Sequence, residues 1–319
     1  MLAQTDGISQ DSVNIDILPE NPGPNQLVNA TISSFSTNVN IAEITWTING
    51  VEKKSGTGVK TFSFITDGLN TTISLGVSAR TVEGDVITKT IDIKPTSVDL
   101  LWQTESFVPP FYKGKPLYSH QNKITFVALP HITNSSGAEI GVKNLVYTWK
   151  LNGSVIENAS GFGKNTYSVI GSIISRPLDV EVDVSGANDN GTGVAEIVVA
   201  PRAPEIIFYK KNPLYGVEFQ NALNASVFLQ NSQNNNENSK EITIVGMPFF
   251  FGISAGNAPE LVYSWSVNGA PIYGDTHQTE QVFRQLDGTS GISQISLEIE
   301  NQNKILQFAT NSFNLQFGQ

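Results

Sequence analysis

Cysteine is absent from the 319 residues of this sequence. Disulfide bonds and cysteine-based metal sites are therefore excluded, including the inter-sheet disulfide that braces antibody domains. A tryptophan at the centre of such a domain would have to pack against aliphatic side chains alone. The absence of cysteine does not place the chain in the cytoplasm, since a β-sandwich can be stable without a disulfide.

Charged residues are also scarce, at 15% of the chain against a usual value of about 25%. Serine, threonine and asparagine fill the polar positions instead, as on the surface of a strand-rich protein. The formal net charge is −10, which would repel a polyanionic duplex. The pairs Lys53-Lys54 and Lys210-Lys211 are isolated, so we expect no nucleic-acid partner.

Histidine occurs only three times, as His120, His131 and His277, and these residues lie far apart in the sequence. No nucleophile-elbow motif is present, and no histidines or carboxylates recur at the helix spacing of a metallohydrolase. We predict that the chain is not an enzyme and that it has no catalytic, metal-binding or cofactor-binding residues and no cofactor. A hydrolase with two carboxylates stays open, because such a pair need not be close in sequence.

No apolar run is long enough to span a bilayer. The most apolar segment, residues 242–255, is short and is interrupted by Gly246, Pro248 and Gly252, so we predict no membrane insertion within this chain. Residues 1–5 resemble the tail of a signal-peptide cleavage region. We therefore expect an exported protein, extracellular or at the cell surface, whose signal segment and any anchor lie outside this chain.

What is present is a short pattern that occurs three times, at residues 44–50, 147–153 and 263–269. Each copy carries a tryptophan in a run that alternates with period two, which predicts a half-buried strand. An Asn-Gly pair follows, and both of its residues accept the positive φ of a tight hairpin turn. We expect the tryptophans to be structural core and the pairs to be turns: Trp46, Trp149 and Trp265; Asn49, Gly50, Asn152, Gly153, Asn268 and Gly269.

The copies are roughly 100 to 120 residues apart, a spacing that suits sandwich domains of about 100 residues. Strand signals every 8–12 residues fit the same architecture. The predicted fold is all-β, with three tandem immunoglobulin-like (PKD-like) β-sandwich domains and short junctions. The predicted domains are 1–97 with a polar N-terminal tail, 98–203, and 204–319 with an asparagine-rich loop at 231–240.

Three other segments allow two interpretations each. Residues 107–112, with Phe107, Phe111 and Tyr112, either plug the end of a domain or form an exposed aromatic patch for a partner or a sugar. Residues 247–251 end in Phe249, Phe250 and Phe251. These cannot all face one core, because alternation sends the middle one outward, so they are buried against a neighbouring loop or domain, or they contact a partner. Residues 188–193 are either a calcium loop or, more simply, a hairpin turn.

The three tryptophan hairpins resemble bacterial immunoglobulin-like or PKD-like domains. PKD domains typically have Trp-Asp-Phe-Gly-Asp-Gly at this strand end, whereas the runs here start at Trp46, Trp149 and Trp265 and end in Asn-Gly. The resemblance therefore implies the fold and no PKD-specific site. Residues 98–102 and 108–115 resemble uncharacterised surface proteins of small-genome, uncultured bacteria, which implies an exported bacterial protein.

These observations favour a non-catalytic extracellular structural protein, a cell-surface, filament or envelope subunit that associates with itself or with another surface protein. The alternative is an adhesin-like binding module that recognises a glycan or a protein through exposed aromatic loops. The six aromatic residues at 107–112 and 249–251 are the candidate partner contacts in either case.

Overall fold

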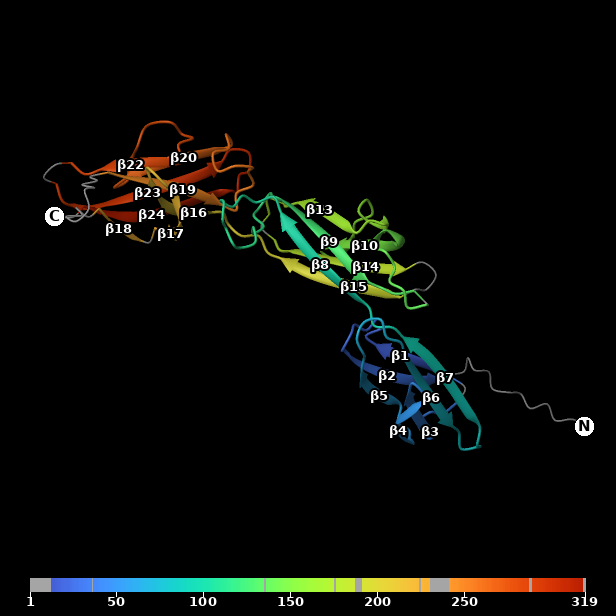
Figure 1. Ribbon diagram of the computed structural model, residues 1–319. Coiled ribbons are helices and arrows are strands. Elements are labelled where there is room, and N and C mark those ends of the chain that lie inside the picture. Colours follow the sequence, from blue (N-terminus) through green and yellow to red (C-terminus); the bar gives the residue numbers. More distant parts are fainter. Residues whose placement is uncertain are drawn as a thin grey trace, which may run out of the picture. The chain divides into compact units, whose positions relative to one another are not determined.

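The computed structural model describes residues 13–35, 37–134, 136–174, 176–186, 191–223, 225–229, 241–286 and 289–317. The polar tail, the loop 231–240 and most of the candidate calcium loop lie outside these ranges. The described residues form β-strands joined by turns, with one 3-10 turn at Val142–Asn144 (Figure 1), which confirms the all-β prediction. Within these ranges no helix has the length and apolarity needed to cross a bilayer.

The chain divides into two compact units. The first contains the described residues up to Leu101, together with Val127–Tyr167 and Asp179–Ile197. The second contains Trp102–Phe126, Ser168–Leu178 and the described residues from Val198 onward. This division does not test the domain boundaries after residues 97 and 203, which stay predictions.

The first seven strands form two sheets, with the orders β1-β2-β5 and β4-β3-β6-β7. This division of strands is that of an immunoglobulin-like Greek-key sandwich. Alternation sends Val28, Ala30 and Ile32 of β2 into the core. The strand bounds are β1 Val13–Leu18, β2 Leu27–Ser34, β3 Glu43–Ile48, β4 Val51–Thr57, β5 Thr61–Ile65, β6 Ile73–Arg80 and β7 Val86–Ile93.

The next strands repeat this division, with the orders β13-β9-β8 and β11-β10-β14-β15 and with β12 paired to β10. These strands differ from the first seven in the connection between β8 and β9, where residues 105–122 form a long loop that belongs to the second unit. The bounds are β8 Ser97–Thr104, β9 Lys123–His131, β10 Leu145–Leu151, β11 Ser154–Val155, β12 Gly161–Phe162, β13 Thr166–Ile170, β14 Leu178–Gly186 and β15 Thr192–Val199.

The last strands give the orders β17-β16-β19-β22 and β18-β24-β23-β20-β21, in which β18 pairs with β24 in parallel. Their core includes Phe208, Phe251, Trp265 and Leu297. The bounds are β16 Glu205–Asn212, β17 Gly216–Ala222, β18 Ser226–Leu229, β19 Glu241–Phe249, β20 Leu261–Val267, β21 Ala270–Pro271, β22 Glu280–Arg284, β23 Gly291–Asn301 and β24 Phe308–Phe317.

The three repeated tryptophans lie on corresponding strands, β3, β10 and β20, and all are buried. Each indole N–H donates to a backbone carbonyl further along the chain, which satisfies the one polar atom that its burial removes from water. The pairs are Trp46 with Val59 at 2.9 Å, Trp149 with Lys164 at 2.9 Å and Trp265 with Gln278 at 3.0 Å.

The expectation that these tryptophans pack against aliphatic side chains alone is wrong. Each lies beside an aromatic ring on the strand after the hairpin: Phe62 on β5, Tyr167 on β13 and Phe283 on β22, with ring centroids 5.9, 5.8 and 6.2 Å away. An aromatic ring therefore packs beside each indole in a chain that has no disulfide.

The Asn-Gly turns have a second role that their φ angles do not reveal. Asn49, Asn152 and Asn268 all have φ near +50°, as expected for these turns. In each, the side-chain oxygen also accepts the backbone N–H of a residue on the neighbouring strand, from Ser74, Asp179 and Gln294 at 2.9, 3.2 and 2.8 Å. Asparagine therefore both permits the turn and ties it to the sheet.

Candidate binding cleft and its buried polar support

The candidate site lies in the second unit, where the loop 105–122 packs on the outer face of β16 and β19. The loop is held by backbone hydrogen bonds: Phe107 N–H donates to the Phe251 carbonyl and Phe250 N–H donates to the Phe107 carbonyl, both at 2.7 Å. These two bonds join the loop to the chain just beyond the end of β19 and so bring the two aromatic segments together.

The three consecutive phenylalanines are buried, with exposed fractions of 3%, 4% and 0% for Phe249, Phe250 and Phe251. As predicted, they do not share one core: Phe251 joins the interior of the last sandwich, and the other two join a separate cluster with Tyr209. Of the two alternatives for this segment, the structure favours burial against a neighbouring loop, because Val108, Tyr112 and Leu117 of the loop contact or cover this cluster.

Phe111 behaves in the opposite way. Pro109 to Tyr112 form a turn closed by the Tyr112 N–H on the Pro109 carbonyl at 3.3 Å. Phe111 is its third residue and has φ of +66°, a position that favours glycine or asparagine. Its side chain is nevertheless 86% exposed. A large apolar residue is thus held in an unfavourable backbone conformation with its ring in solvent, and strain of this kind is characteristic of functional positions.

A cleft of about 590 Å³ lies beside this turn, within the size range of ligand sites. Phe219 of β17 faces both Phe111 and Tyr209, with ring centroids 6.3 and 5.4 Å away and ring planes tilted by 56° and 60°. The rings therefore enclose a notch instead of a flat platform. The lining residues are Pro109, Pro110, Phe111, Tyr112, Lys113, Tyr209, Val217, Phe219, Gln220 and Phe249.

The polar groups of the cleft are few. Lys113 carries the only charge among the lining residues that the structure describes, and Gln220 adds an exposed carboxamide. Burial raises the pKa of the Tyr209 phenol, so that hydroxyl stays protonated and able to donate. The site could therefore offer a ligand apolar ring faces together with hydroxyl, amide and ammonium donors.

Trp102 does not join this aromatic surface. The Lys115 ammonium lies 3.3 Å from the centre of the Trp102 ring, a cation–π contact that covers the ring face. Burial lowers the pKa of Lys115, in keeping with its position over the indole. The basic residues of this loop thus have two different roles, because Lys115 is engaged and Lys113 borders the cleft.

A buried network of amides supports the loop from below. Asn122 is fully buried, and its side-chain oxygen accepts from Gln307 Nε2 at 2.6 Å and from Lys304 Nζ at 3.0 Å. Its amide nitrogen donates to Ser106 Oγ at 2.7 Å. Gln307 is 1% exposed and donates further to the His120 carbonyl at 2.6 Å. The network joins the loop to the turn between β23 and β24, 185 residues away in sequence.

Both oxygens and both nitrogens of this amide pair are satisfied. Gln307 Oε1 accepts from Gly252 N at 2.8 Å and from Asn301 Nδ2 at 3.1 Å. Burial lowers the pKa of Lys304, although Glu105 and Glu260 partly oppose the shift. A fully satisfied buried network favours one geometry, because moving any of its side chains leaves a buried polar atom without a hydrogen-bond partner.

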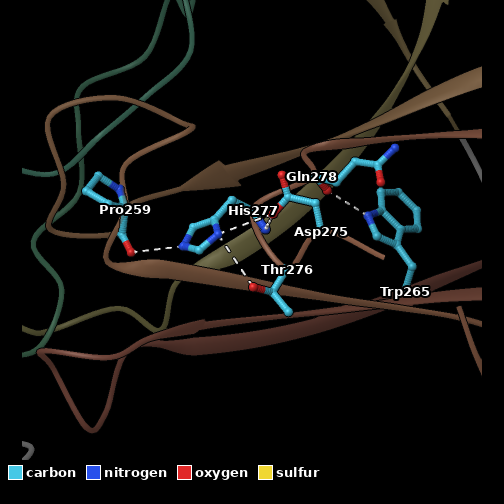
Figure 2. A network of polar contacts seen from close by, with 6 residues as sticks. All are labelled: Pro259, Trp265, Asp275, Thr276, His277 and Gln278. Atoms are coloured by element: carbon cyan, nitrogen blue, oxygen red, sulfur yellow. Dashed lines mark hydrogen bonds and ion pairs between the residues drawn. The ribbon is translucent and has the colours of Figure 1, made fainter. Parts of the chain in front are cut away.

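Figure 2 shows the other notable polar cluster, in the segment between β21 and β22. His277 lies with Thr276 and Asp275, residue types that also form catalytic triads. Here Asp275 Oδ1 and Thr276 Oγ1 both lie near the same ring nitrogen, Nδ1, at 3.4 and 3.5 Å, while Nε2 lies 3.3 Å from the Pro259 carbonyl. A triad needs its acid and its nucleophile on opposite ring nitrogens, so this cluster does not have that geometry.

The cluster in Figure 2 has a structural role. The pKa of Asp275 is lowered, mainly by the backbone N–H of His277. The Thr276 carbonyl accepts from the backbone of Tyr263, and the Gln278 carbonyl accepts from the indole of Trp265. The segment thus closes over the tryptophan strand. His120 and His131 lie elsewhere; the prediction that the chain is not an enzyme stays a prediction.

The structure thus gathers Phe111, Tyr112, Phe249 and Phe250 around the cluster and its cleft. Phe107 joins them through its backbone only, and its ring lies near Gly256. Sequence reasoning missed Tyr209 and Phe219, which complete the cleft, and Asn122 and Gln307, which support it. The run 206–209 is apolar at four consecutive positions, which indicates a strand buried on both faces. The amides gave no comparable signal, because isolated asparagine and glutamine are common on surfaces.

Comparison with protein-family models gives no match, and comparison with curated proteins gives none. Among solved structures, the chain is similar to three N-terminal domains of the bacteriophage RB49 Highly Immunogenic Outer Capsid protein, at 12% identity and TM-score 0.27, covering 96% of this chain and 98% of that chain. It is also similar to a central fibronectin-III array of RIM-binding protein, at 11% identity and TM-score 0.32, covering 96% of both.

A third similar structure is a Bacteroides ovatus protein of a mixed-linkage glucan utilization locus, in complex with a mixed-linkage heptasaccharide. The identity is 14% and the TM-score 0.23, covering 96% of this chain and 70% of that chain. At such low identities and scores these similarities say nothing about what the present chain binds.

Proposed function

We propose that this chain is a non-catalytic structural protein of the cell surface, an exported subunit whose sandwiches act as stiff spacers. The observation that carries the proposal is the buried amide network of Asn122, Gln307 and Lys304. A loop attached only by exposed contacts would move freely, whereas this network tolerates one arrangement. Fixed geometry is what a stalk, filament or envelope subunit requires.

A second observation supports stiffness within the first unit. Thr96, which follows β7, is 6% exposed and donates through Oγ1 to the Thr192 carbonyl at 2.5 Å. Lys94 Nζ donates to the Asn134 carbonyl at 3.2 Å. The short segment after β7 is therefore tied by side-chain hydrogen bonds to residues about 40 and 96 positions further along the chain, unlike a free linker.

The test is a distance measurement on the full chain. Because the sequence has no cysteine, Ile170→Cys and Tyr273→Cys would introduce two unique labelling sites. Both side chains belong to the second unit and are 70% and 91% exposed. Pulsed electron resonance between spin labels should give one narrow distance distribution. A broad distribution at both low and high salt would show that the spacer is flexible and would refute the proposal.

Assembly is tested separately. Side chains such as Leu214 and Tyr215, at the tip between β16 and β17, are 82% and 85% exposed and fit a chain that buries surface against copies of itself or another surface protein. Sedimentation at increasing concentration should show association. A monomer at all concentrations would leave the spacer role without self-assembly and would direct the search to another protein.

A second candidate function is adhesin-like binding, and the observation that favours it is the strained, exposed Phe111 beside the cleft. Phe250→Ala is not a useful test of binding because that side chain is buried and its loss would damage packing. Phe111→Ala removes an exposed ring instead. Loss of glycan or protein binding with an unchanged spin-label distance would support this function; unchanged binding would exclude the cleft.

A further inference from the structure

We infer that the cleft between the turn 109–112 and β17 is a binding site for a carboxylate-bearing saccharide, with a sugar ring against Phe111 and its carboxylate on Lys113. The inference rests on the second candidate function above and names its ligand class. Three observations support it: the aromatic rings of the notch, the charge of Lys113 among the described lining residues, and the strained turn that carries Phe111 next to that lysine.

The apolar part of the site suits a sugar ring. One face of a pyranose exposes C–H groups that pack against aromatic rings, while its hydroxyls need polar partners around the edge. Phe111 supplies an exposed ring, and Phe219 closes the notch at 6.3 Å from it. Gln220, Tyr112 and Tyr209 are among the lining residues, and carboxamide and hydroxyl groups can donate to or accept from the hydroxyls of a sugar.

The charge of the site selects an acid. No carboxylate lies among the described lining residues, and Lys113 is exposed and has no ion-pair partner among the residues that the structure describes. The chain as a whole carries a net charge of −10, so an ammonium with no carboxylate among the described lining residues is a local exception. An ammonium offers a charge-assisted hydrogen bond to a carboxylate, which a neutral sugar cannot use as strongly.

The turn fixes the backbone from which the Phe111 ring and the Lys113 ammonium extend. Lys113 follows Tyr112 directly, and Tyr112 is held by edge contacts with Phe249 and Phe250 at centroid distances of 5.6 and 6.2 Å. A side chain added at Gly114 would collide with the Tyr112 ring. The backbone that carries Phe111 and Lys113 is therefore held before a ligand arrives, which lowers the cost of ordering it on binding.

The experiment titrates the full chain with an oligogalacturonate and with the methyl ester of that oligosaccharide. The ester keeps the sugar rings but removes the negative charge. Sialyllactose serves as a second acidic sugar. Calorimetry should show that at least one of the acids binds and that the oligogalacturonate binds more tightly than its ester. Lys113→Gln should weaken binding of the acid about tenfold, the scale of one charge-assisted bond, and leave the ester unchanged. Phe111→Ala should weaken both. Tyr273→Ala, an exposed aromatic outside the cleft, is the matched control.

The outcomes are separable. If the ester and the acid bound with equal affinity and Phe111→Ala weakened both, the cleft would be a sugar site, but its selectivity for acids would be refuted. No binding of either acid at millimolar concentration would overturn the site itself, as would equal losses in Tyr273→Ala. If poly-glutamate bound tightly and Phe111→Ala did not weaken that binding, the cleft would attract acidic ligands by charge alone, and the saccharide proposal would be refuted. None of these results alters the spin-label distance, which tests the spacer role independently.

Discussion

Replacement of Asn122 is the sharpest test of the buried network. Asn122→Ala removes four hydrogen bonds: two that Asn122 accepts, from Gln307 at 2.6 Å and from Lys304 at 3.0 Å, and two that it donates, to Ser106 at 2.7 Å and to the Phe250 carbonyl at 3.5 Å. Lys304 keeps the Gly252 carbonyl, and Ser106 keeps Thr104 at 3.2 Å. The main uncompensated loss is one hydrogen of the Gln307 amide, buried with that residue at 1% exposure, since the bond to the Phe250 carbonyl is long at 3.5 Å.

The magnitude follows from these partners. An unsatisfied buried donor costs about 1–3 kcal/mol, and the small cavity left by the amide adds about 1 kcal/mol. We expect a total of about 3 kcal/mol, which corresponds to a loss of roughly 150-fold in local protection. Asn122→Asp keeps an acceptor for Gln307 and places a carboxylate beside the Lys304 ammonium, so it should cost less than about 1.5 kcal/mol near neutral pH.

Hydrogen exchange of the full chain measures this directly, because local opening is read peptide by peptide. Peptides that cover residues 105–122 and 250–258 should exchange much faster in Asn122→Ala than in the parent chain. Asn257→Ala, an exposed amide in the same unit, is the control. If Asn122→Ala and Asn257→Ala exchanged alike, or if Asn122→Asp were the worse variant, the network would not be what fixes the loop.

Three further predictions concern single residues. Phe111→Gly should stabilise the fold by about 1 kcal/mol in denaturant titration, since glycine tolerates φ of +66°, while it abolishes ligand binding; a destabilised variant would show that the turn is not strained. Trp265→Phe should cost about 2–3 kcal/mol in urea unfolding, because it strands the Gln278 carbonyl and leaves a cavity; a loss under about 1 kcal/mol would mean that the indole hydrogen bond contributes little. Burial raises the pKa of Tyr263 above its unfolded value, so its contribution is complete below about pH 10 and is lost as pH rises further. Unfolding midpoints should therefore fall above about pH 10 in the parent chain and fall less in Tyr263→Phe, and equal slopes would contradict this.

The sequence could indicate much of the local structure but little of the cleft. The strands of the tryptophan hairpins follow from alternation, and the positive φ of Asn49, Asn152 and Asn268 follows from the Asn-Gly pairs, because both are properties of a few neighbouring residues. The aromatic partners of the tryptophans were within reach of the same reasoning, since Phe62, Tyr167 and Phe283 recur at similar distances after each copy.

Whether each aromatic segment is buried or exposed does not follow from its neighbouring residues in the sequence. Phe111 and Phe250 belong to similar aromatic stretches, and both have φ near +65°, yet one is exposed and the other is buried. The difference arises because loop 105–122 packs over one of them, through contacts such as Asn122 to the Phe250 carbonyl, 128 residues apart. No periodicity encodes a contact over that distance.

The sequence by itself therefore determined the β-strands, the three tryptophan hairpins and the lack of cysteine chemistry, since each depends on residue type and short-range geometry. Only the tertiary structure decided that three phenylalanines are interior, that a fourth lines a cleft with a single lysine, and that Asn122 is paired with Gln307. Those outcomes depend on contacts between segments that are distant in sequence, because these contacts decide which side chains are buried and which polar atoms find a partner.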